Sequence, residues 1–376
     1  MKVLKFGGTS VGSAERMHAL VDLIHDNDPK IVVLSAMSGT TNSLVEISSA
    51  LHAADHSKAK ELTDALKKKY DSVIKELYKT EGALTKGKEL IESHFNYIHS
   101  FNNNPFGIKE ERAILAQGEL LSTAMFHYYL EEINIPSVLL AALNFMRIDE
   151  NEEPDMQYID TAIATELAKY KGSKLFITQG YICRNAVGEI DNLKRGGSDY
   201  TATILGAAIR SEEIQIWTDI DGMHNNDPRI VDKTHPIAEL SFDEAAELAY
   251  FGAKILHPTC ILPAQVRNIP VRLLNTMQPE AKGTIISSKI SGSRFTAIAA
   301  KDGITAITIK SGRMLLAYGF LRAVFEVFER YKTPIDMITT SEVAVSLTID
   351  TTKNLDAIVT ELKEFCSVKV DSDMTI

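Results

Sequence analysis

The chain has 376 residues, of which 45% are hydrophobic and 24% charged, and these values predict a globular protein of two or three domains. A formal net charge of −10 argues against nucleic acid or an anionic membrane as the main partner, but not against nucleotides, which local clusters of charge can bind. Three widely spaced cysteines without a Cys-x-x-Cys or His-Glu-x-x-His motif indicate neither a disulfide framework nor a metal site built from side chains. Because the N-terminus lacks signal-peptide regions and no apolar run approaches the ~18 residues of a membrane span, we expect a cytoplasmic protein.

The chain begins with a pattern that is typical of phosphate binding. A short strand over residues 3–6 is followed by Gly7 and Gly8, and a helix is expected from about Ser13 because apolar residues recur with helical spacing. A helix N-terminus after such a turn offers free N–H groups and the positive end of a dipole, and Lys5 can add an ammonium group. The turn matches neither the P-loop nor the dinucleotide fingerprint, so an ordinary strand-to-helix turn remains an alternative.

A second strand, over residues 31–34, leads into a run of small and hydroxyl residues from Ser35 to Asn42. Loops at the carboxyl ends of strands bind ligands in open α/β sheets, although a Ser/Thr-rich helix cap would look the same. Residues 43–100 are predicted to form a helical excursion from the sheet, with its charged residues in solvent.

The next helix carries Glu119 beside an apolar face that includes Leu121 and Met125. Since Glu119 lies off that face, exposure to solvent is the simpler expectation, with ligand binding as the alternative. Further strands are predicted over residues 138–140 and 175–178, and the second of these runs into Gly180 and Tyr181.

A second pair of glycines, Gly196 and Gly197, stands at the start of an apolar helix over residues 201–209, flanked by Arg195 and Asp199. The planar guanidinium of arginine suits a carboxylate or a phosphate, whereas a surface turn with an Arg–Asp pair is the alternative.

The chain then returns to the sheet. A strand over residues 214–217 ends at Thr218 and Asp219, and a turn follows that presents Arg229. Further on, Ser241 and Glu244 form a capping box for a helix expected to run towards residues 252–254 and to end near His257.

The alternation of strands and helices predicts a three-layer α/β domain with a mostly parallel sheet over residues 1–288. Residues 287–293 have the composition of a linker. From residue 294 to 376 the pattern becomes strand, helix, strands, helix and strand, which predicts a ferredoxin-like α+β domain.

Taken together, these motifs resemble the aspartate kinases of the amino-acid kinase superfamily, and the C-terminal region resembles an ACT domain, an amino-acid-sensing module. The resemblance covers nearly the whole chain and rests on seven segments in the family's order: residues 5–11, 35–42, 118–119, 195–199, 217–219, 227–229 and 251–258. His224 stands where these kinases often carry a tyrosine near the nucleotide. Family members continue into a second ACT unit, which we expect to be truncated here.

The resemblance implies transfer of the γ-phosphoryl group of ATP to the side-chain carboxylate of L-aspartate, with Mg²⁺ bridging the phosphates and no dedicated protein cage for the metal. A carboxylate with a pKa of about 4 is already ionised at neutral pH, so no general base is needed. Asp199 is then an organiser of Lys5, Lys254 or Mg²⁺, and the two lysines neutralise charge on the transferring phosphoryl group.

The implied sites are the following. The catalytic residues are Lys5, Asp199 and Lys254. L-Aspartate is expected to contact Ser35, Thr41, Glu119, Tyr181, Arg195, Gly196, Gly197 and Ser198. ATP is expected to contact Lys5, Gly7, Gly8, Thr218, Asp219, His224, Arg229, Lys254 and Ile255.

The resemblance also implies feedback inhibition by L-lysine in a homo-oligomer, expected to be a dimer through ACT units. The expected effector residues are Met314, Gly319, Phe320, Leu321, Asp336, Ser341 and Glu342. Two acids, Asp336 and Glu342, suit the two ammonium groups of lysine, with strand capping as the alternative. The competing functions are another kinase of the same fold and a non-catalytic amino-acid sensor.

Overall fold

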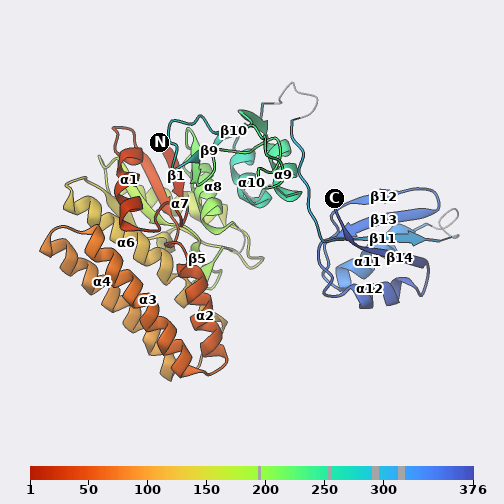
Figure 1. The fold of residues 1–376 in the computed structure, drawn as a ribbon, viewed down its shortest axis with the longest axis horizontal. Helices are drawn as coiled ribbons and strands as arrows, with labels where there is room; N and C mark the ends of the chain where they lie inside the picture. The colour runs from red at the N-terminus through yellow and green to blue at the C-terminus, as the bar shows by residue number, and fades with distance from the viewer. Residues whose placement is uncertain (194–195, 253–255, 290–295, 312–317) are drawn as a thin grey trace. The chain divides into compact units, whose positions relative to one another are not determined.

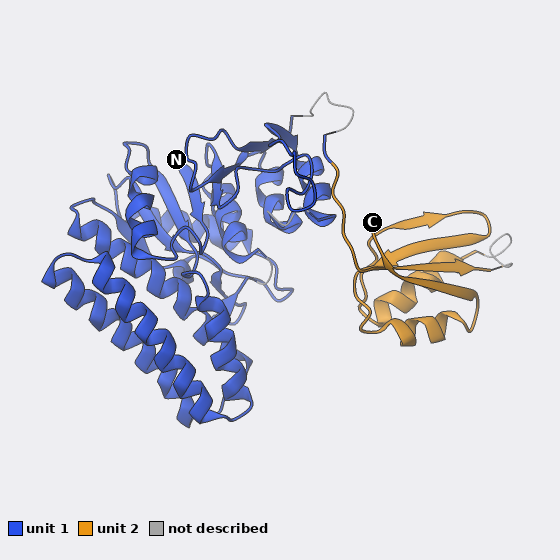
Figure 2. Ribbon diagram, in the orientation of Figure 1, with its two compact units in different colours: residues 1–297 blue, residues 298–376 orange. Residues whose placement is uncertain are grey.

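In the computed structural model of the chain, residues 1–193, 196–252, 256–289, 296–311 and 318–376 are described. They form two compact units, Met1–Ala297 (unit 1) and Ile298–Ile376 (unit 2), shown in two colours in Figure 2. The predicted linker falls largely on residues 290–295, which lie outside the described residues.

Unit 1 alternates strands with helices, as the sequence predicted, and Figure 1 labels most of them. Its strands are β1 (Lys2–Phe6), β2 (Lys30–Leu34), β3 (Val138–Leu140), β4 (Leu175–Gln179), β5 (Ile182–Arg184), β6 (Ile190–Asn192), β7 (Ile214–Thr218), β8 (Glu239–Ser241), β9 (Val271–Asn275) and β10 (Thr284–Ser287). Its α-helices are α1 (Ala14–Ile24), α2 (Thr40–His52), α3 (His56–Leu77), α4 (Glu81–Ser100), α5 (Ile108–Leu115), α6 (Gln117–Glu132), α7 (Met156–Ala168), α8 (Gly197–Ala208), α9 (Phe242–Tyr250) and α10 (Pro258–Val266).

Eight of these strands form one sheet in the order β3-β4-β2-β1-β7-β9-β10-β8, and all neighbours except β9 and β10 run parallel. Successive side chains of a strand point to opposite faces. Accordingly, Leu4 and Phe6 of β1 belong to one hydrophobic core, whereas Val3 belongs to another. A core on each face confirms the predicted three-layer arrangement.

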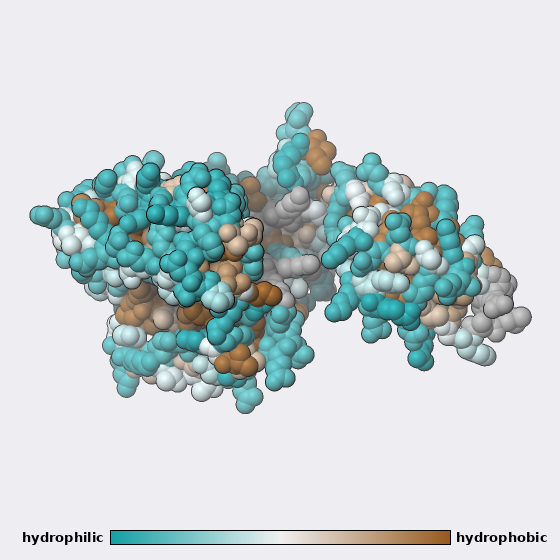
Figure 3. Space-filling view, turned by 90° about the horizontal axis from the view of Figure 1, so that it is seen from below, coloured by the Kyte–Doolittle hydropathy of each residue, from teal (hydrophilic) through white to brown (hydrophobic). Residues whose placement is uncertain are grey.

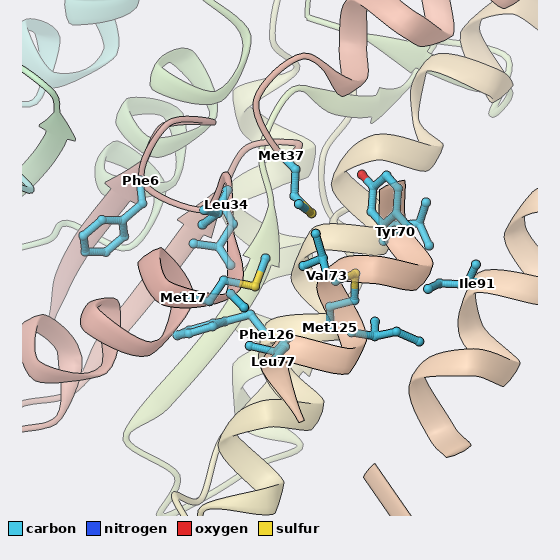
Figure 4. Packing of buried hydrophobic residues seen from close by; sticks show 14 of the residues in the cluster. Phe6, Met17, Leu34, Met37, Tyr70, Val73, Leu77, Ile91, Met125 and Phe126 are labelled. Atoms are coloured by element: carbon cyan, nitrogen blue, oxygen red, sulfur yellow. The ribbon is translucent and has the colours of Figure 1, made fainter. Parts of the chain in front are cut away.

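The predicted helical excursion is confirmed by α2, α3 and α4, and Figure 1 shows the long helices α3 and α4 lying side by side and extending away from the sheet. Their apolar faces join the core on that side of the sheet, where Figure 4 shows Tyr70, Val73 and Ile91 among residues of β1, β2 and α6. The excursion is therefore packed into unit 1 and is not a separate bundle.

The prediction for the helix after Ser241 was wrong at its end. The capping box of Ser241 and Glu244 is present, but α9 ends at Tyr250, and His257 is the N-cap of the next helix, α10. Gly252 has a φ of 138°, a conformation that does not continue a helix, and Pro258 at the first position of α10 has its φ preset for a helix start. The strands β5, β6 and β8–β10 were not predicted from the sequence.

Unit 2 contains β11 (Ile304–Lys310), α11 (Phe320–Arg330), β12 (Ile338–Thr340), β13 (Ala344–Ile349), α12 (Leu355–Leu362) and β14 (Ser367–Met374). The strands pair antiparallel in the order β12-β13-β11-β14. This order and the element sequence are those of a ferredoxin-like fold, as predicted. Its core lies between the sheet and the two helices, with Ile307, Val324, Leu347 and Ile358 fully or almost fully buried.

Candidate functional site

The glycine turn after β1 lies against the loop after β2. The amide of Ser38 donates to the carbonyl oxygen of Gly8 over 3.1 Å, and the amide of Ser35 donates to that of Phe6 over 3.2 Å. A Cβ atom on Gly8 would lie 2.8 Å from the carbonyl oxygen of Ala36, so this approach requires glycine. Ser10 is fully buried and its hydroxyl pairs with that of Thr276 over 2.8 Å, so it ties the turn to the loop after β9.

Lys5, at the end of β1, and Asp199, in the first turn of α8, form the charged centre of the site. Lys5 Nζ lies 2.7 Å from Asp199 Oδ1, and the two side chains are 10% and 17% exposed. Lys5 Nζ also lies 3.4 Å from where a Cβ of Gly7 would be, so the ammonium group reaches over the glycine turn. The predicted pairing of these two residues is therefore present in the fold.

The second glycine turn begins α8. Gly196 is the N-cap with a φ of 68°, and a Cβ atom there would lie 2.0 Å from Cys260 Sγ, so glycine is required at this position. The neighbouring strand end is also unusual, because Tyr181 has a φ of 67° although it is not glycine. Its amide donates to Thr201 Oγ1 over 2.9 Å. Such strained residues cost about 1–3 kcal/mol and cluster at functional sites.

Glu119 of α6 is buried, so the simpler expectation from the sequence, exposure to solvent, was wrong. It is 4% exposed, Oε1 accepts a hydrogen bond from the amide of Ala36 over 3.1 Å, and Oε2 is buried without a hydrogen-bond partner. Burial raises the pKa of Glu119 to about 8. Glu119 is buried although it lies off the apolar face, because small residues of α6 on this side, such as Gly118, let the helix pack against the loop after β2.

The order of the strands places the two halves of the site. The carboxyl ends of parallel strands share one edge of the sheet. Along that edge the ends follow the order β4, β2, β1, β7 and β9, so Tyr181 and Ser35 lie on one side of Lys5 and Thr218 lies on the other. The residues expected at the amino acid and those expected at the nucleotide are thus separated by β1.

On the β7 side, Thr218, His224 and Arg229 each form a polar contact with a residue close in sequence. Thr218 Oγ1 accepts from the amide of Ile220 over 3.0 Å. The imidazole of His224 lies between Asp221 Oδ1, 2.7 Å from Nε2, and Thr234 Oγ1, 2.8 Å from Nδ1. Arg229 is exposed and its Nε lies 2.9 Å from Asp227 Oδ1, while Asp219 is exposed.

Three of the expected site residues, Arg195, Lys254 and Ile255, lie outside the described residues, as does Met314 of the expected effector site. Thr41 lies at the start of α2 and Ser198 at the start of α8, each on the same edge as Lys5. In the part of the chain that the structure describes, no group of three His, Cys, Asp or Glu side chains is arranged to hold a metal ion.

Comparison with known proteins shows the family of the chain. A family model described as the amino acid kinase family matches residues 1–275. Lysine-sensitive aspartokinase 3 of Escherichia coli is 35% identical over 389 residues, covering 100% of this chain and 85% of that protein. The chain belongs to the aspartokinases of the amino acid kinase family. Aspartokinase 1, chloroplastic, of Arabidopsis thaliana is 36% identical, with 98% of this chain and 68% of that protein covered.

Solved aspartokinase structures have the same fold. E. coli aspartokinase III in complex with aspartate and ADP, in the R-state, superposes with a TM-score of 0.84 at 33% identity, covering 100% of this chain and 86% of that one. The T-state complex of the same enzyme with lysine and aspartate gives a TM-score of 0.80. Both units of this chain therefore have counterparts in an aspartokinase.

The expected effector residues lie at the ends of elements in unit 2. Gly319, with a φ of 88°, is the N-cap of α11, which begins with Phe320 and Leu321. Asp336 comes just before β12, and its amide donates to the carbonyl oxygen of Thr348 over 2.9 Å. Ser341 and Glu342 form the turn between β12 and β13.

No described helix of this aspartokinase is long and apolar enough to cross a membrane.

Proposed function

We infer that this chain is an aspartate kinase, which transfers the γ-phosphoryl group of ATP to the side-chain carboxylate of L-aspartate to give 4-phospho-L-aspartate. The observation that carries this inference is the Lys5–Asp199 pair at the end of β1, between the two halves of the site. Phosphoryl transfer needs mainly positioning and stabilisation of charge. The Lys5 ammonium over the glycine turn supplies that charge, and the ionised substrate carboxylate attacks the γ-phosphorus without a general base.

The amino-acid half of the site is proposed to recognise the zwitterionic end of aspartate. Glu119 offers a buried carboxylate oxygen without a partner, which suits an ammonium group. Arg195 is proposed to bind the α-carboxylate through its planar fork. Further contacts are assigned to residues around this half of the edge, namely Ser35, Thr41, Tyr181, Gly196, Gly197 and Ser198.

The nucleotide half is proposed to lie over β7, with Thr218, Asp219, His224, Arg229, Lys254 and Ile255 as its contacts and with Gly7 and Gly8 beside the phosphates. Mg²⁺ is usually held by one or two carboxylates together with substrate phosphates. Asp199 could supply one such carboxylate oxygen. When bound, Mg²⁺ neutralises phosphate charge.

Release of ADP from MgATP, measured with and without L-aspartate, tests this function. ADP release that depends on L-aspartate supports the proposal. Release with glutamate, carbamate or a nucleoside monophosphate in place of aspartate would indicate another kinase of this fold, and amino-acid binding without turnover would indicate a sensor.

We propose that unit 2 is the ACT regulatory region, that it binds L-lysine as an inhibitor, and that it joins copies of the chain. The N-terminus of α11 after Gly319 suits a carboxylate, and Asp336 and Glu342 suit ammonium groups. All three residues of the edge strand β12 are exposed, as are Leu321 and Phe325 of α11. Figure 3 shows a hydrophobic area on the visible face of this unit. An exposed edge strand and exposed apolar side chains each suit contact with a second copy.

Inhibition by L-lysine and by L-threonine, compared in the unmodified chain and in Asp336→Ala, tests the effector. Lysine is expected to inhibit the unmodified chain and to lose potency in the variant. Inhibition by threonine alone, or lysine inhibition that Asp336→Ala leaves unchanged, would contradict the assignment. Sedimentation of the chain with and without lysine tests the proposed dimer. The cytoplasmic location expected from the sequence stays a prediction.

A further inference from the structure

The long helix α3 touches the loop at the amino-acid half of the site. We call residues 35–42 the substrate loop. Lys69 Nζ donates to the carbonyl oxygen of Ser38 over 2.6 Å, and the hydroxyl of the next residue, Tyr70, lies 3.0 Å from Thr40 Oγ1. Two consecutive residues of the helical excursion therefore bind one short stretch of this loop.

Tyr70 is held firmly behind the loop. Its side chain is completely buried, and its ring packs edge-on against Phe95 of α4, with ring centres 5.8 Å apart. In Figure 4, Tyr70 and Met37 of the substrate loop lie at the same end of the hydrophobic cluster. Burial raises the pKa of Tyr70, so its hydroxyl stays neutral and can either donate to Thr40 Oγ1 or accept from it.

Helix α6 holds the other side of the same loop. A Cβ atom on Gly118 would lie 2.8 Å from Cβ of Ala36 and 3.2 Å from Cγ2 of Thr40, so the two segments are in close contact. Ser122 Oγ donates to the carbonyl oxygen of Ser35 over 2.7 Å. The amide of Ala36 in turn donates to Glu119 Oε1 over 3.1 Å. The substrate loop is thus clamped between α3 and α6, and one of its amides orients the buried carboxylate.

We propose that Tyr70, with Lys69 as a weaker second contact, is a positioning residue for the amino-acid substrate. It holds the substrate loop so that the Ala36 amide orients Glu119. This inference rests on the proposed function, in which Glu119 binds the ammonium group of aspartate. The proposal gives α3 a role in the affinity for aspartate, whereas the sequence of this helix indicates only an apolar face and a charged face.

Tyr78 offers a matched control for Tyr70. It follows α3 directly, is 4% exposed, and its hydroxyl donates to the carbonyl oxygen of Met125 over 2.9 Å, away from the substrate loop. Tyr70→Phe and Tyr78→Phe therefore each remove one buried hydroxyl group. Both variants are expected to lower the melting temperature, but only Tyr70→Phe is expected to raise the KM for aspartate, by about threefold to tenfold for one net hydrogen bond, with the KM for ATP unchanged.

Thr40→Val tests whether the hydrogen bond transmits this effect. It should raise the KM for aspartate as Tyr70→Phe does, and the double variant should raise it no further, because the bond is already lost. Lys69→Met is expected to raise the KM about twofold, as an exposed contact, whereas its exposed neighbour Lys68→Met should not.

Equal KM values for aspartate in Tyr70→Phe and Tyr78→Phe would overturn the positioning role while leaving the proposed function intact. Additive effects in the Tyr70→Phe/Thr40→Val double variant would reject the hydrogen bond as the link. If the unmodified chain showed no aspartate-dependent ADP release, the proposed function itself would fail, and the role of the loop in binding aspartate would fail with it.

Discussion

The two halves of the site, on either side of β1, are built differently. The amino-acid half is buried and closely packed: Glu119 is almost inaccessible, and the loop that faces it is held from two helices. The nucleotide half is more open, since Asp219 and Arg229 are exposed, and among the described residues the side chains of His224 and Arg229 bond only to near neighbours in sequence, Asp221, Thr234 and Asp227.

We propose that the difference follows from the ligand that each half recognises. A small zwitterion offers few groups, so discrimination depends on desolvated charges whose partners are already in place. A nucleotide is larger and its phosphates can be bound by backbone amides and dipoles at a glycine turn. We therefore expect substitutions on the amino-acid side to change affinity for aspartate steeply, and those on the nucleotide side to act weakly on ATP.

The largest effect is expected at the boundary between the halves. Lys5→Ala should lower kcat by about 10²–10³, because it removes one preorganised charge from the transferring phosphoryl group. The KM for aspartate should change little. Steady-state kinetics with both substrates varied will check this, and a variant with unchanged kcat would exclude Lys5 from transition-state stabilisation.

Glu119→Gln should raise the KM for aspartate by about ten- to a hundredfold, the cost of a hydrogen bond to a charged group. The pH dependence sharpens this expectation. Since the pKa of Glu119 is raised to about 8, its carboxylate is mostly protonated below that pH and cannot attract an ammonium group as an anion. The KM of the unmodified enzyme should fall as pH rises from 6.5 to 8 and then level off.

The Glu119→Gln variant supplies the check on that profile, because its side chain does not titrate and the fall should be absent. Exposed Glu46 of α2 offers a control, and Glu46→Gln should keep the unmodified profile. A fall of equal size in Glu119→Gln would assign the titration to another group.

The contribution of Glu119 to folding stability should decrease as pH rises, whereas the affinity for aspartate should increase. The pKa of Glu119 is higher in the folded protein, about 8, than its ordinary value of 4.5, so the folded state binds the proton more tightly between these values. Folding stability contributed by this group is therefore complete below pH 4.5 and is lost as pH rises through 8. Without substrate, Glu119→Gln should melt at a higher temperature than the unmodified chain, by on the order of a few degrees at pH 8.5 and by less at pH 6.

The smallest kinetic effect is expected from a substitution in the nucleotide half of the site. His224→Phe removes the contacts with Asp221 and Thr234, and we expect the KM for ATP to rise about threefold with the KM for aspartate unchanged. A larger change in the KM for aspartate than for ATP would show that the two halves are not independent.

Much of this arrangement could be predicted from local patterns. The Gly7–Gly8 and Gly196–Gly197 turns, the buried run at residues 31–34 and the alternation in unit 2 each depend on a few neighbouring residues, whose backbone preferences and periodicity act over short distances. The strand order of unit 2 also follows from its element sequence, since the ferredoxin-like fold is the usual solution for it.

The sequence by itself determined the alternation of the main strands and helices, the two glycine turns that precede helices, and the presence of Lys5 and Asp199 beside those turns. Only the tertiary structure decided that Glu119 is buried. Its burial depends on contact between α6 and a loop more than 80 residues away in sequence, and helical periodicity carries no information about such a distant contact. The same is true of the bond between Tyr70 and Thr40. Sequence periodicity reports which face of a helix is apolar, whereas the partners of a polar group on the other face depend on how distant segments pack.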